Sequence, residues 1–163
     1  MREVHHIAIS VRDMAASKRF YGEALGLKET LNAEVKGAEI EGQLRLRPGM
    51  TGQVAYFQGP TQVGQIELIE WQPPNEKPNP PKRPGDPGVF LLSIAVSKEE
   101  LKESWDRMQA MGVTEFSPPE KSVLQNYGEI EVFVVEDPDG VMIEFVALPT
   151  REEIKAFRSA SKN

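Results

Sequence analysis

The chain has no cysteine and only two histidines, which are the neighbours His5 and His6. Without cysteine there are no disulfides, no thiolate nucleophiles and no cysteine-based zinc or iron–sulfur sites. Any histidine chemistry must therefore start from these two side chains.

Long apolar runs and an excess of basic charge are also missing. No stretch approaches the roughly 18 apolar residues of a membrane-spanning helix, and the N-terminal MREVHHIAIS lacks the apolar core of a signal peptide. Lysine and arginine number 19 against 25 acidic residues, a net charge of −6, whereas nucleic acids and anionic membranes require basic patches. We therefore expect a cytoplasmic protein with no nucleic-acid or membrane partner.

The remaining composition is that of an ordinary globular protein, with 39% apolar and 27% charged residues. A chain of 163 residues is long enough for one domain with a real core, or for two small modules that share one.

The sequence contains an internal repeat. HIAIS at His6–Ser10 recurs as SIAVS at residues 93–97, and each copy leads into a predicted helix, residues 14–24 or 98–111. Gly26 and Gly112 follow these helices, as expected for residues just past a helix end. Later in each copy a glycine precedes a short apolar strand, QIEL or MIEF. The first copy holds about ten extra residues, which fall within residues 30–53.

Each half therefore reads β-α-β-β-β, and the predicted fold class is α+β with tandem βαβββ modules. We expect a first module at residues 1–72, a linker at 73–88 and a second module at 89–148. The linker region is rich in proline, with prolines at 73, 74, 78, 80, 81, 84 and 87, a composition typical of a stiff extended segment. Residues 149–163 are predicted to form a tail helix, with Thr150 as N-cap and Glu153 in the capping-box position.

A carboxylate stands in the last strand of each copy, as Glu67 and as Glu144. Either could simply face solvent, but both strands are otherwise mostly apolar, and a buried carboxylate needs a partner. Two carboxylates brought together repel each other unless a cation or a proton lies between them. The recurrence favours partnered carboxylates with a shared role.

Strand alternation divides the first strand into two faces. His6, Ala8 and Ser10 share the small, polar face expected to line a cleft, and Ser93 falls at the position equivalent to His6. His5 lies on the opposite, mostly apolar side, where we expect it to close a sheet edge or to hydrogen-bond locally.

Four further residues carry weaker expectations. Tyr56 and Trp71 would line the cleft or fill the core, and the core is the favoured interpretation. Arg45 and Arg47, within the extra residues of the first half, would close over an anionic substrate or lie on a solvated strand, and the solvated strand is favoured.

Three segments, HHIAISVRDMAASKRFYGEALGL, GQIELIE and DPDGVMIEF, resemble the vicinal oxygen chelate superfamily. That group contains glyoxalase I, methylmalonyl-CoA epimerase, extradiol dioxygenases, and the fosfomycin and bleomycin resistance proteins. The resemblance covers residues 4–148. It implies paired βαβββ modules, each a curled mixed sheet with a helix on its outer face, that form a cup-like cleft around a metal. The implied metal-facing positions are His6, Glu67, Ser93 and Glu144.

Ser93 departs from this pattern, because metal-using members commonly have histidine there. The remaining set, His6, Glu67 and Glu144, offers one imidazole and two carboxylates to a divalent ion. Such a set suits Mn, Fe, Ni, Co or Mg better than a tight structural zinc site, although zinc remains a candidate. It also differs from the triad of two histidines and one carboxylate that is typical of oxygen-activating iron enzymes.

The resemblance implies a metal-dependent enzyme of the glyoxalase or epimerase type, an isomerase or lyase acting on a small molecule through a chelated oxyanion. Glu67 or Glu144 would move the proton, and the sequence does not choose between them. A metal-free small-molecule-binding protein of the resistance type is the alternative, and a dioxygenase is less favoured. Because family members are often dimers, we expect a homodimer. The substrate is not identified.

Overall fold

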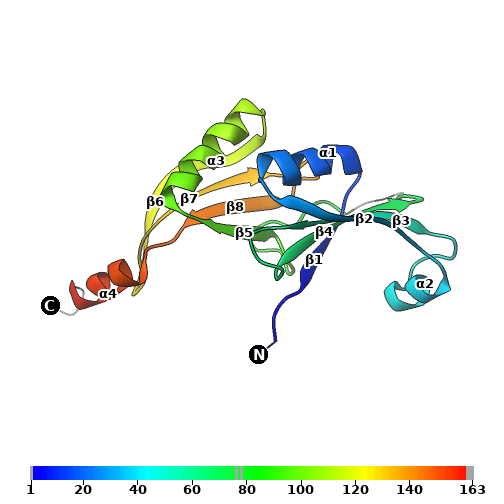
Figure 1. Ribbon diagram of the computed structural model, residues 1–163, viewed down its shortest axis with the longest axis horizontal. Helices are drawn as coiled ribbons and strands as arrows, with labels where there is room; N and C mark the ends of the chain where they lie inside the picture. The colour runs from blue at the N-terminus through cyan, green and yellow to red at the C-terminus, as the bar shows by residue number, and fades with distance from the viewer. Residues whose placement is uncertain (1, 76, 78, 161–163) are drawn as a thin grey trace. The chain divides into compact units, whose positions relative to one another are not determined.

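The computed structural model describes residues 2–75, 77 and 79–160 (Figure 1). Pro78 of the predicted linker and residues 161–163 of the predicted tail helix lie outside the described residues. The chain divides into two compact units, residues 1–80 and 81–163, and each unit is described by itself.

The first unit is a β-α-β-β-β module with one additional helix. Its elements are β1 (His6–Ser10), α1 (Met14–Lys18), the π-helical η1 (Arg19–Ala24), β2 (Lys28–Lys36), α2 (Ala38–Leu44), β3 (Thr51–Gln58) and β4 (Gln65–Gln72). The strands form a mixed sheet in the order β1-β4-β3-β2. β1 runs parallel to β4, while the other two pairings are antiparallel.

The predicted helix at residues 14–24 is confirmed, as α1 continued by η1. The Asp13 side chain caps it by accepting a hydrogen bond from the Ala16 backbone nitrogen at 3.0 Å. After η1 the chain turns at Gly26, whose φ of 76° suits glycine. The helix covers one face of the sheet (Figure 1). The buried side chains between them include Phe20, Tyr21, Ala24, Phe57 and Leu68.

The extra residues of the first half form α2 and the loops on either side of it, because residues 37–50 connect β2 to β3 whereas only residues 125–127 connect β6 to β7. Arg45 ends α2 with a left-handed φ of 53°, and Arg47 lies in the loop that follows. Both side chains are exposed, as expected, but the prediction that they lie on a strand is wrong. The Arg47 Nη2 donates a hydrogen bond to the Pro74 carbonyl at 3.5 Å.

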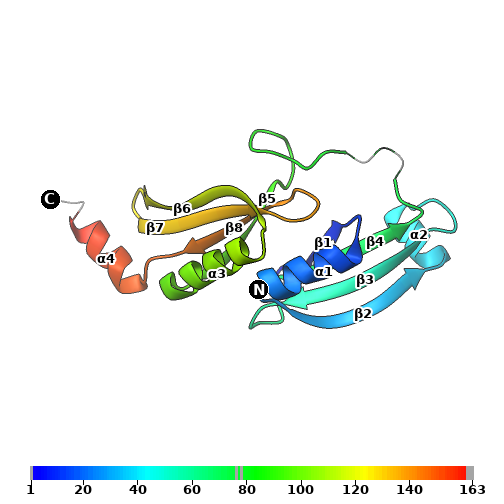
Figure 2. The same cartoon turned by 90° about the horizontal axis from the view of Figure 1, so that it is seen from above.

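The second unit repeats the scheme without an additional helix between its strands. It contains β5 (Leu91–Val96), α3 (Lys98–Ala110), β6 (Thr114–Leu124), β7 (Gly128–Glu136), β8 (Met142–Ala147) and α4 (Arg151–Ala160). Its sheet has the order β5-β8-β7-β6 and is again mixed, with β5 parallel to β8 (Figure 2). The predicted fold class, α+β with two mixed sheets in βαβββ modules, is confirmed.

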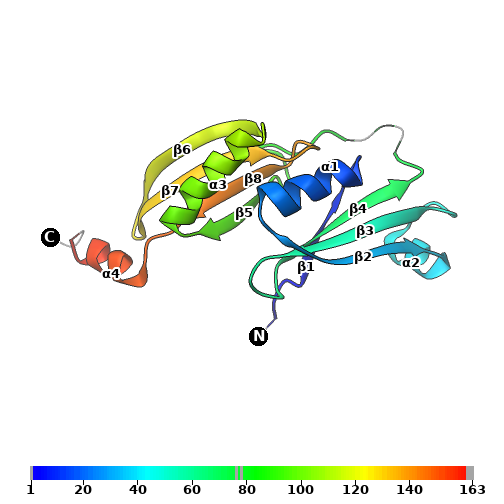
Figure 3. The same cartoon turned by 45° about the horizontal axis from the view of Figure 1, so that its top comes forward.

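Both helix starts in the second unit follow their capping residues. Ser97 and Glu100 form a reciprocal capping box at α3. Thr150 and Glu153 do the same at α4, because each backbone nitrogen donates to the other's side chain. The predicted N-cap of the tail helix is therefore confirmed. α4 lies beyond the end of the sheet where β6 and β7 connect (Figure 3), and its Arg158 Nε donates to the Asn126 carbonyl at 2.7 Å.

Aromatic stacking builds the core of the second unit. The rings of Phe133 on β7 and Phe145 on β8 stack at 4.8 Å with an angle of 11°. Trp105 of α3 meets Phe133 edge-on at 5.2 Å. Leu101 and Met108, at helical spacing on the same helix, are 2% and 0% exposed. The sheet thereby buries one face against α3.

The strand β6 lies at the edge of its sheet and its pairing is broken twice. Its ladder with β7 shifts between Glu115 and Ser117 and again between Ser117 and Glu120. The second shift contains Pro118 and Pro119, which have no backbone N–H to donate. Prolines are tolerated at such edges and bulges.

The segment after the unit boundary is tied to the second unit. Nη1 of Arg83 donates to the Gly140 carbonyl at 3.1 Å, and Nη2 forms an ion pair with Glu136 at 2.8 Å.

Among the described residues, no helix has the length and apolar character to cross a membrane.

Candidate functional site

Glu67 lies in the middle of the first sheet, on β4 between β1 and β3. Its direct partners across the two ladders are Ala8 on β1 and Tyr56 on β3. The side chain is 14% exposed. A carboxylate at this depth needs hydrogen-bond or charged partners, and the neighbouring strands supply them.

His6 is the first of these partners. Its Nε2 lies 3.2 Å from Oε2 of Glu67, and its Nδ1 lies 2.8 Å from Nδ1 of His5. Both imidazole nitrogens of His6 therefore have a polar neighbour. The expectation that His5 hydrogen-bonds locally is confirmed, and its partner is the candidate ligand itself.

Tyr56 is the second partner of Glu67. Burial, followed by hydrogen bonding to the Glu67 side chain and by its charge, raises the pKa of Tyr56 to about 12. Its ring and the His6 imidazole form a T-shaped pair, with centroids 5.5 Å apart and planes at 77°. Tyr56 is half-buried, so the expectation that it fills the core is wrong.

Sequence reasoning missed this role because an aromatic residue in a predicted strand usually packs in the core. The available signal was the antiparallel pairing of the two strands around Gly59 and Gly64, which brings Tyr56 opposite Glu67.

Trp71 does not lie in the core either, so the expectation that it fills the core is also wrong. It is half-buried, its Nε1 donates to the Ser10 hydroxyl at 3.2 Å, and its ring lies over Gly52.

Glu144 occupies the matching place on β8 in the second unit. Its direct ladder partners are Ser93 on β5 and Val134 on β7. The Ser93 hydroxyl donates to Oε2 of Glu144 at 2.5 Å. The repeated carboxylate is again partnered, but by a hydroxyl in place of an imidazole.

The register between the first and last strands of each unit, β1–β4 and β5–β8, differs by two residues from the alignment of the sequence repeat. The repeat aligns His6 with Ser93, whereas the residue directly opposite Glu67 is Ala8 and the residue directly opposite Glu144 is Ser93. Since side chains alternate along a strand, a shift of two residues keeps His6 and Ser93 on the same face as their glutamates. The predicted face is confirmed, while the predicted equivalence within the ladder is wrong.

The distance between His6 and Glu67 is compatible with a metal ion bound by both side chains. Two ligands that each lie about 2.0–2.2 Å from one ion are themselves about 3 Å apart, close to the 3.2 Å between His6 Nε2 and Glu67 Oε2. Within residues 2–75, 77 and 79–160, no three acidic or histidine side chains are grouped so as to hold a metal. The predicted set of His6, Glu67 and Glu144 draws on both units, so their convergence stays a prediction.

Known proteins resemble this chain along most of its length. The profile of the Glyoxalase/Bleomycin resistance protein/Dioxygenase superfamily matches residues 3–145. The lactoylglutathione lyase-like protein terB of Aspergillus terreus is 27% identical over 156 residues, which cover 90% of this chain and 75% of that protein.

Solved structures also resemble this chain along most of its length. A glyoxalase/dioxygenase from Nostoc punctiforme is 26% identical with a TM-score of 0.66, covering 91% of this chain and 92% of its own. A glyoxalase family protein from Bacillus cereus is 18% identical with a TM-score of 0.74, covering 92% and 96%. The second likeness concerns the fold alone.

Proposed function

Because this chain belongs to the Glyoxalase/Bleomycin resistance protein/Dioxygenase superfamily, we propose that it is a metal-dependent enzyme of the glyoxalase or epimerase type. It would act on a small molecule as an isomerase or a lyase. The observation that carries the proposal is the His6–Glu67 pair, with 3.2 Å between its nearest nitrogen and oxygen. The name of the Aspergillus terreus relative, lactoylglutathione lyase-like, supports a lyase.

His6 and Glu67 would hold the ion, and Glu144 of the second unit would complete the protein's share of the ligands. One imidazole and two carboxylates suit Mn, Fe, Co, Ni, Mg or Zn, and they leave positions for water or substrate oxygens. A bound divalent ion would supply Lewis-acid stabilisation of the negative charge that develops on a substrate oxygen.

The protein's part in the reaction would be to move a proton. For an isomerisation, a carboxylate takes the proton from a hydroxyl-bearing carbon next to a carbonyl, the C–H electron pair becomes a carbon–carbon double bond, and the carbonyl π electrons move to the carbonyl oxygen. The proton is then returned to the former carbonyl carbon, while the hydroxyl of the first carbon passes its proton to the other oxygen and becomes the new carbonyl. Returning the proton instead to the opposite face of the carbon that lost it completes an epimerisation. Neither outcome requires an oxidant or a reductant.

The hydrogen bonds favour different roles for the two glutamates. Glu67 has neighbours on two strands, His6 and Tyr56, which suits a carboxylate that stays in place as a ligand. Glu144 accepts from Ser93 through Oε2, and we assign its Oε1 to the proton transfer. Ser93 would then orient the base.

A metal titration tests the proposal. Apoprotein of the wild type, His5→Ala and His6→Ala is titrated with Mn²⁺ and Co²⁺, and binding is followed by calorimetry. His6→Ala should lower the affinity by about 100-fold or more, since losing a ligand exceeds the 10- to 100-fold effects typical of outer partners. His5→Ala keeps the His6 imidazole and should lose less. A wild type that binds neither metal would refute the enzyme proposal.

The second candidate is a metal-free binding protein of the resistance type. The Ser93–Glu144 hydrogen bond favours it, because this carboxylate already has a partner within the protein. Under this alternative, the wild type and His6→Ala would both be metal-free after purification without chelators, and equally stable. The dioxygenase remains the least favoured, because the ligand set contains a single histidine.

We propose in addition that the chain forms a homodimer, as many members of its family do. Light scattering after size exclusion should then give twice the mass of the chain. A mass equal to one chain at all concentrations would contradict the dimer without affecting the proposed metal site.

A further inference from the structure

We propose that Tyr56 is a positioning residue for the candidate metal site, which holds the Glu67 carboxylate in the orientation needed to bind a divalent ion beside His6. This inference rests on the proposed function and adds to it a residue from a third strand. His6 and Glu67 come from β1 and β4, whereas Tyr56 comes from β3.

The ladder fixes where the Tyr56 side chain begins. Tyr56 and Glu67 are directly opposite on the antiparallel strands β3 and β4, and such partners project from the same face with Cβ atoms about 4.5–5.5 Å apart. Both strands are internal to the sheet. The neighbours of Tyr56 on β3, Ala55 and Phe57, are 0% and 1% exposed, so the backbone at this position is anchored on both sides.

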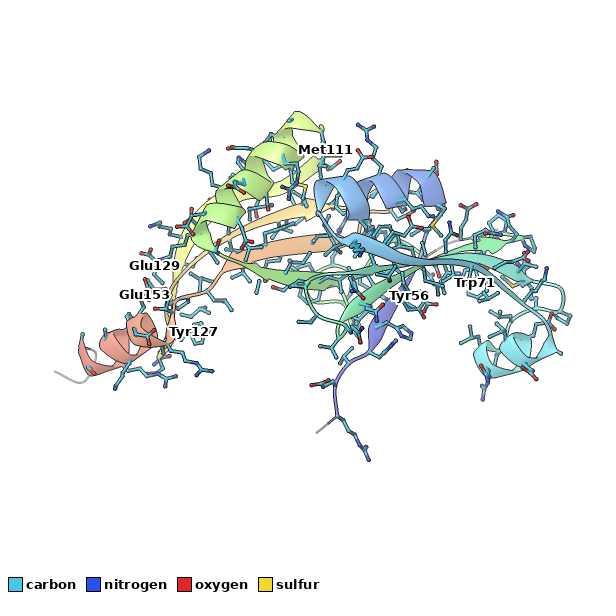
Figure 4. All side chains as sticks on the ribbon, viewed as in Figure 1. Tyr56, Trp71, Met111, Tyr127, Glu129 and Glu153 are labelled. Carbon is cyan, nitrogen blue, oxygen red and sulfur yellow. The ribbon has the colours of Figure 1, made fainter. Side chains whose placement is uncertain are left out.

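Two contacts of one side chain then reach both candidate ligands. Tyr56 lies directly opposite Glu67 in the ladder, and that carboxylate contributes to the raised pKa of the phenol. Because a phenol keeps its proton at neutral pH, its hydroxyl is available as a donor to Glu67. Its ring forms a T-shaped pair with the His6 imidazole, with centroids 5.5 Å apart. Side chains that hydrogen-bond to a ligand fix its orientation toward the metal. Tyr56 is labelled in Figure 4.

The second unit shows that the strand scheme does not require this tyrosine. Val134 on β7 is the residue directly opposite Glu144, and it is 9% exposed and apolar. A valine has no donor for a carboxylate. The tyrosine therefore occurs opposite Glu67, which also has His6 beside it. Glu144, which has Ser93 beside it, faces an apolar valine on the strand β7.

Tyr56→Phe is the test variant, because it removes the hydroxyl and keeps the ring against His6. Tyr127→Phe, in the turn between β6 and β7 of the second unit, is the matched control. Apoproteins are titrated with Co²⁺ alone, and both the affinity and the visible absorption of the bound ion are recorded. Tyr56→Phe should weaken binding about 10- to 100-fold and change the absorption spectrum, while the control matches the wild type.

A double-variant cycle separates positioning from a general loss of structure. In the Glu67→Gln background, adding Tyr56→Phe should cause little further loss of Co²⁺ affinity, because the two residues act through one interaction. The urea midpoints of the apoproteins show whether each variant folds. Additive losses of affinity in the double variant would refute the positioning role.

The outcomes also distinguish this inference from the proposed function. If the wild type binds Co²⁺ and Tyr56→Phe binds it within twofold, Tyr56 has no positioning role and the metal site stands. If the wild type and Tyr127→Phe both fail to bind, the proposed function is refuted, and the role of Tyr56 at a metal site is refuted with it.

Discussion

The two units carry the same carboxylate at the same place in their last strand and surround it with different side chains. Glu67 lies between an imidazole and a phenol, whereas Glu144 lies between a serine hydroxyl and a valine. The strand order is the same in both sheets. The repeated backbone therefore determines where a carboxylate lies, and single residues on the neighbouring strands determine its chemistry.

The largest expected effect separates the two carboxylates directly. Glu67→Gln should lower metal affinity by about 100-fold or more, because it removes an anionic ligand from the pair with His6. Glu144→Gln should cost less, about 10-fold, since Ser93 already engages that carboxylate. Calorimetric titration with Mn²⁺ at one pH gives both values, with Glu120→Gln on β6 as the control. Equal losses at Glu67 and Glu144 would mean that the two units contribute alike.

Ser93→His would place an imidazole on the face of Glu144, as His6 is on the face of Glu67, although within the ladder Ser93 matches Ala8. An imidazole adds a neutral nitrogen donor and should tighten metal binding about tenfold, with the preference shifting toward Zn, Ni and Co. Activity need not rise, because the new ligand would occupy a position that a substrate oxygen needs. The measurement is a titration of both proteins followed by competition with a chelator. Unchanged or weaker affinity would show that position 93 does not face the ion.

The comparison extends to a serine at matching places in the two helices. Ser17 is 0% exposed, and within the described part of the chain its hydroxyl has no hydrogen-bond partner. Ser104 is 5% exposed and accepts from Nη2 of Arg107 at 3.2 Å. A buried hydroxyl without a partner costs about 1–3 kcal/mol, and alanine is the better helix former.

Ser17→Ala should therefore raise the free energy of unfolding by about 1 kcal/mol, a value at the low end of that cost. Ser104→Ala should be neutral or slightly destabilising, because the gain in helix propensity offsets a lost hydrogen bond. Urea denaturation of the metal-free proteins measures both. A Ser17→Ala variant less stable than the wild type would mean that the hydroxyl has a partner in solution.

The smallest effect concerns Tyr56 at high pH. Its folded pKa of about 12 exceeds the value near 10 expected in the unfolded chain. The stability linked to it is therefore complete below about pH 10 and is lost as the pH rises toward 12, because the unfolded chain releases this proton first. Urea midpoints between pH 8 and pH 12 should fall more steeply for the wild type than for Tyr56→Phe.

The cause of that pKa can be tested separately. Burial is the largest cause, followed by the hydrogen bond and the charge of Glu67. Glu67→Gln should therefore lower the pKa of Tyr56 while leaving it above the ordinary value. Carbon-13 NMR of the tyrosine rings measures it. An unchanged pKa in Glu67→Gln would indicate that the hydroxyl does not contact the carboxylate.

The sequence predicted the repeated scheme because its signals are local and strong. Apolar spacing, capping side chains and glycine stops mark α1 and α3, and the turn at Asp137–Gly140 marks the start of β8. α2 has none of these signals. It spans seven residues, includes Gly42, buries no side chain and lacks a capping side chain. Such a helix cannot be recognised from periodicity.

The candidate site was predicted in part for a similar reason. Strand alternation correctly places His6 on the face of Glu67 and Ser93 on the face of Glu144. It cannot fix which residues lie directly opposite, because a shift of two residues preserves every face. The role of Tyr56 depends on the pairing between β3 and β4, which brings together residues eleven positions apart. Alternation within one strand contains no information about that pairing.

The prolines of β6 have a consequence for how separate molecules meet. An exposed edge strand with a full row of backbone donors invites a strand from another molecule, which is the first step of sheet-based aggregation. Phe116, Val123 and Leu124 on this strand are 51%, 64% and 45% exposed, so the side chains alone would favour such an encounter. Pro118 and Pro119 remove two adjacent donors and interrupt the ladder between these apolar positions, so an incoming strand cannot extend along the whole of β6.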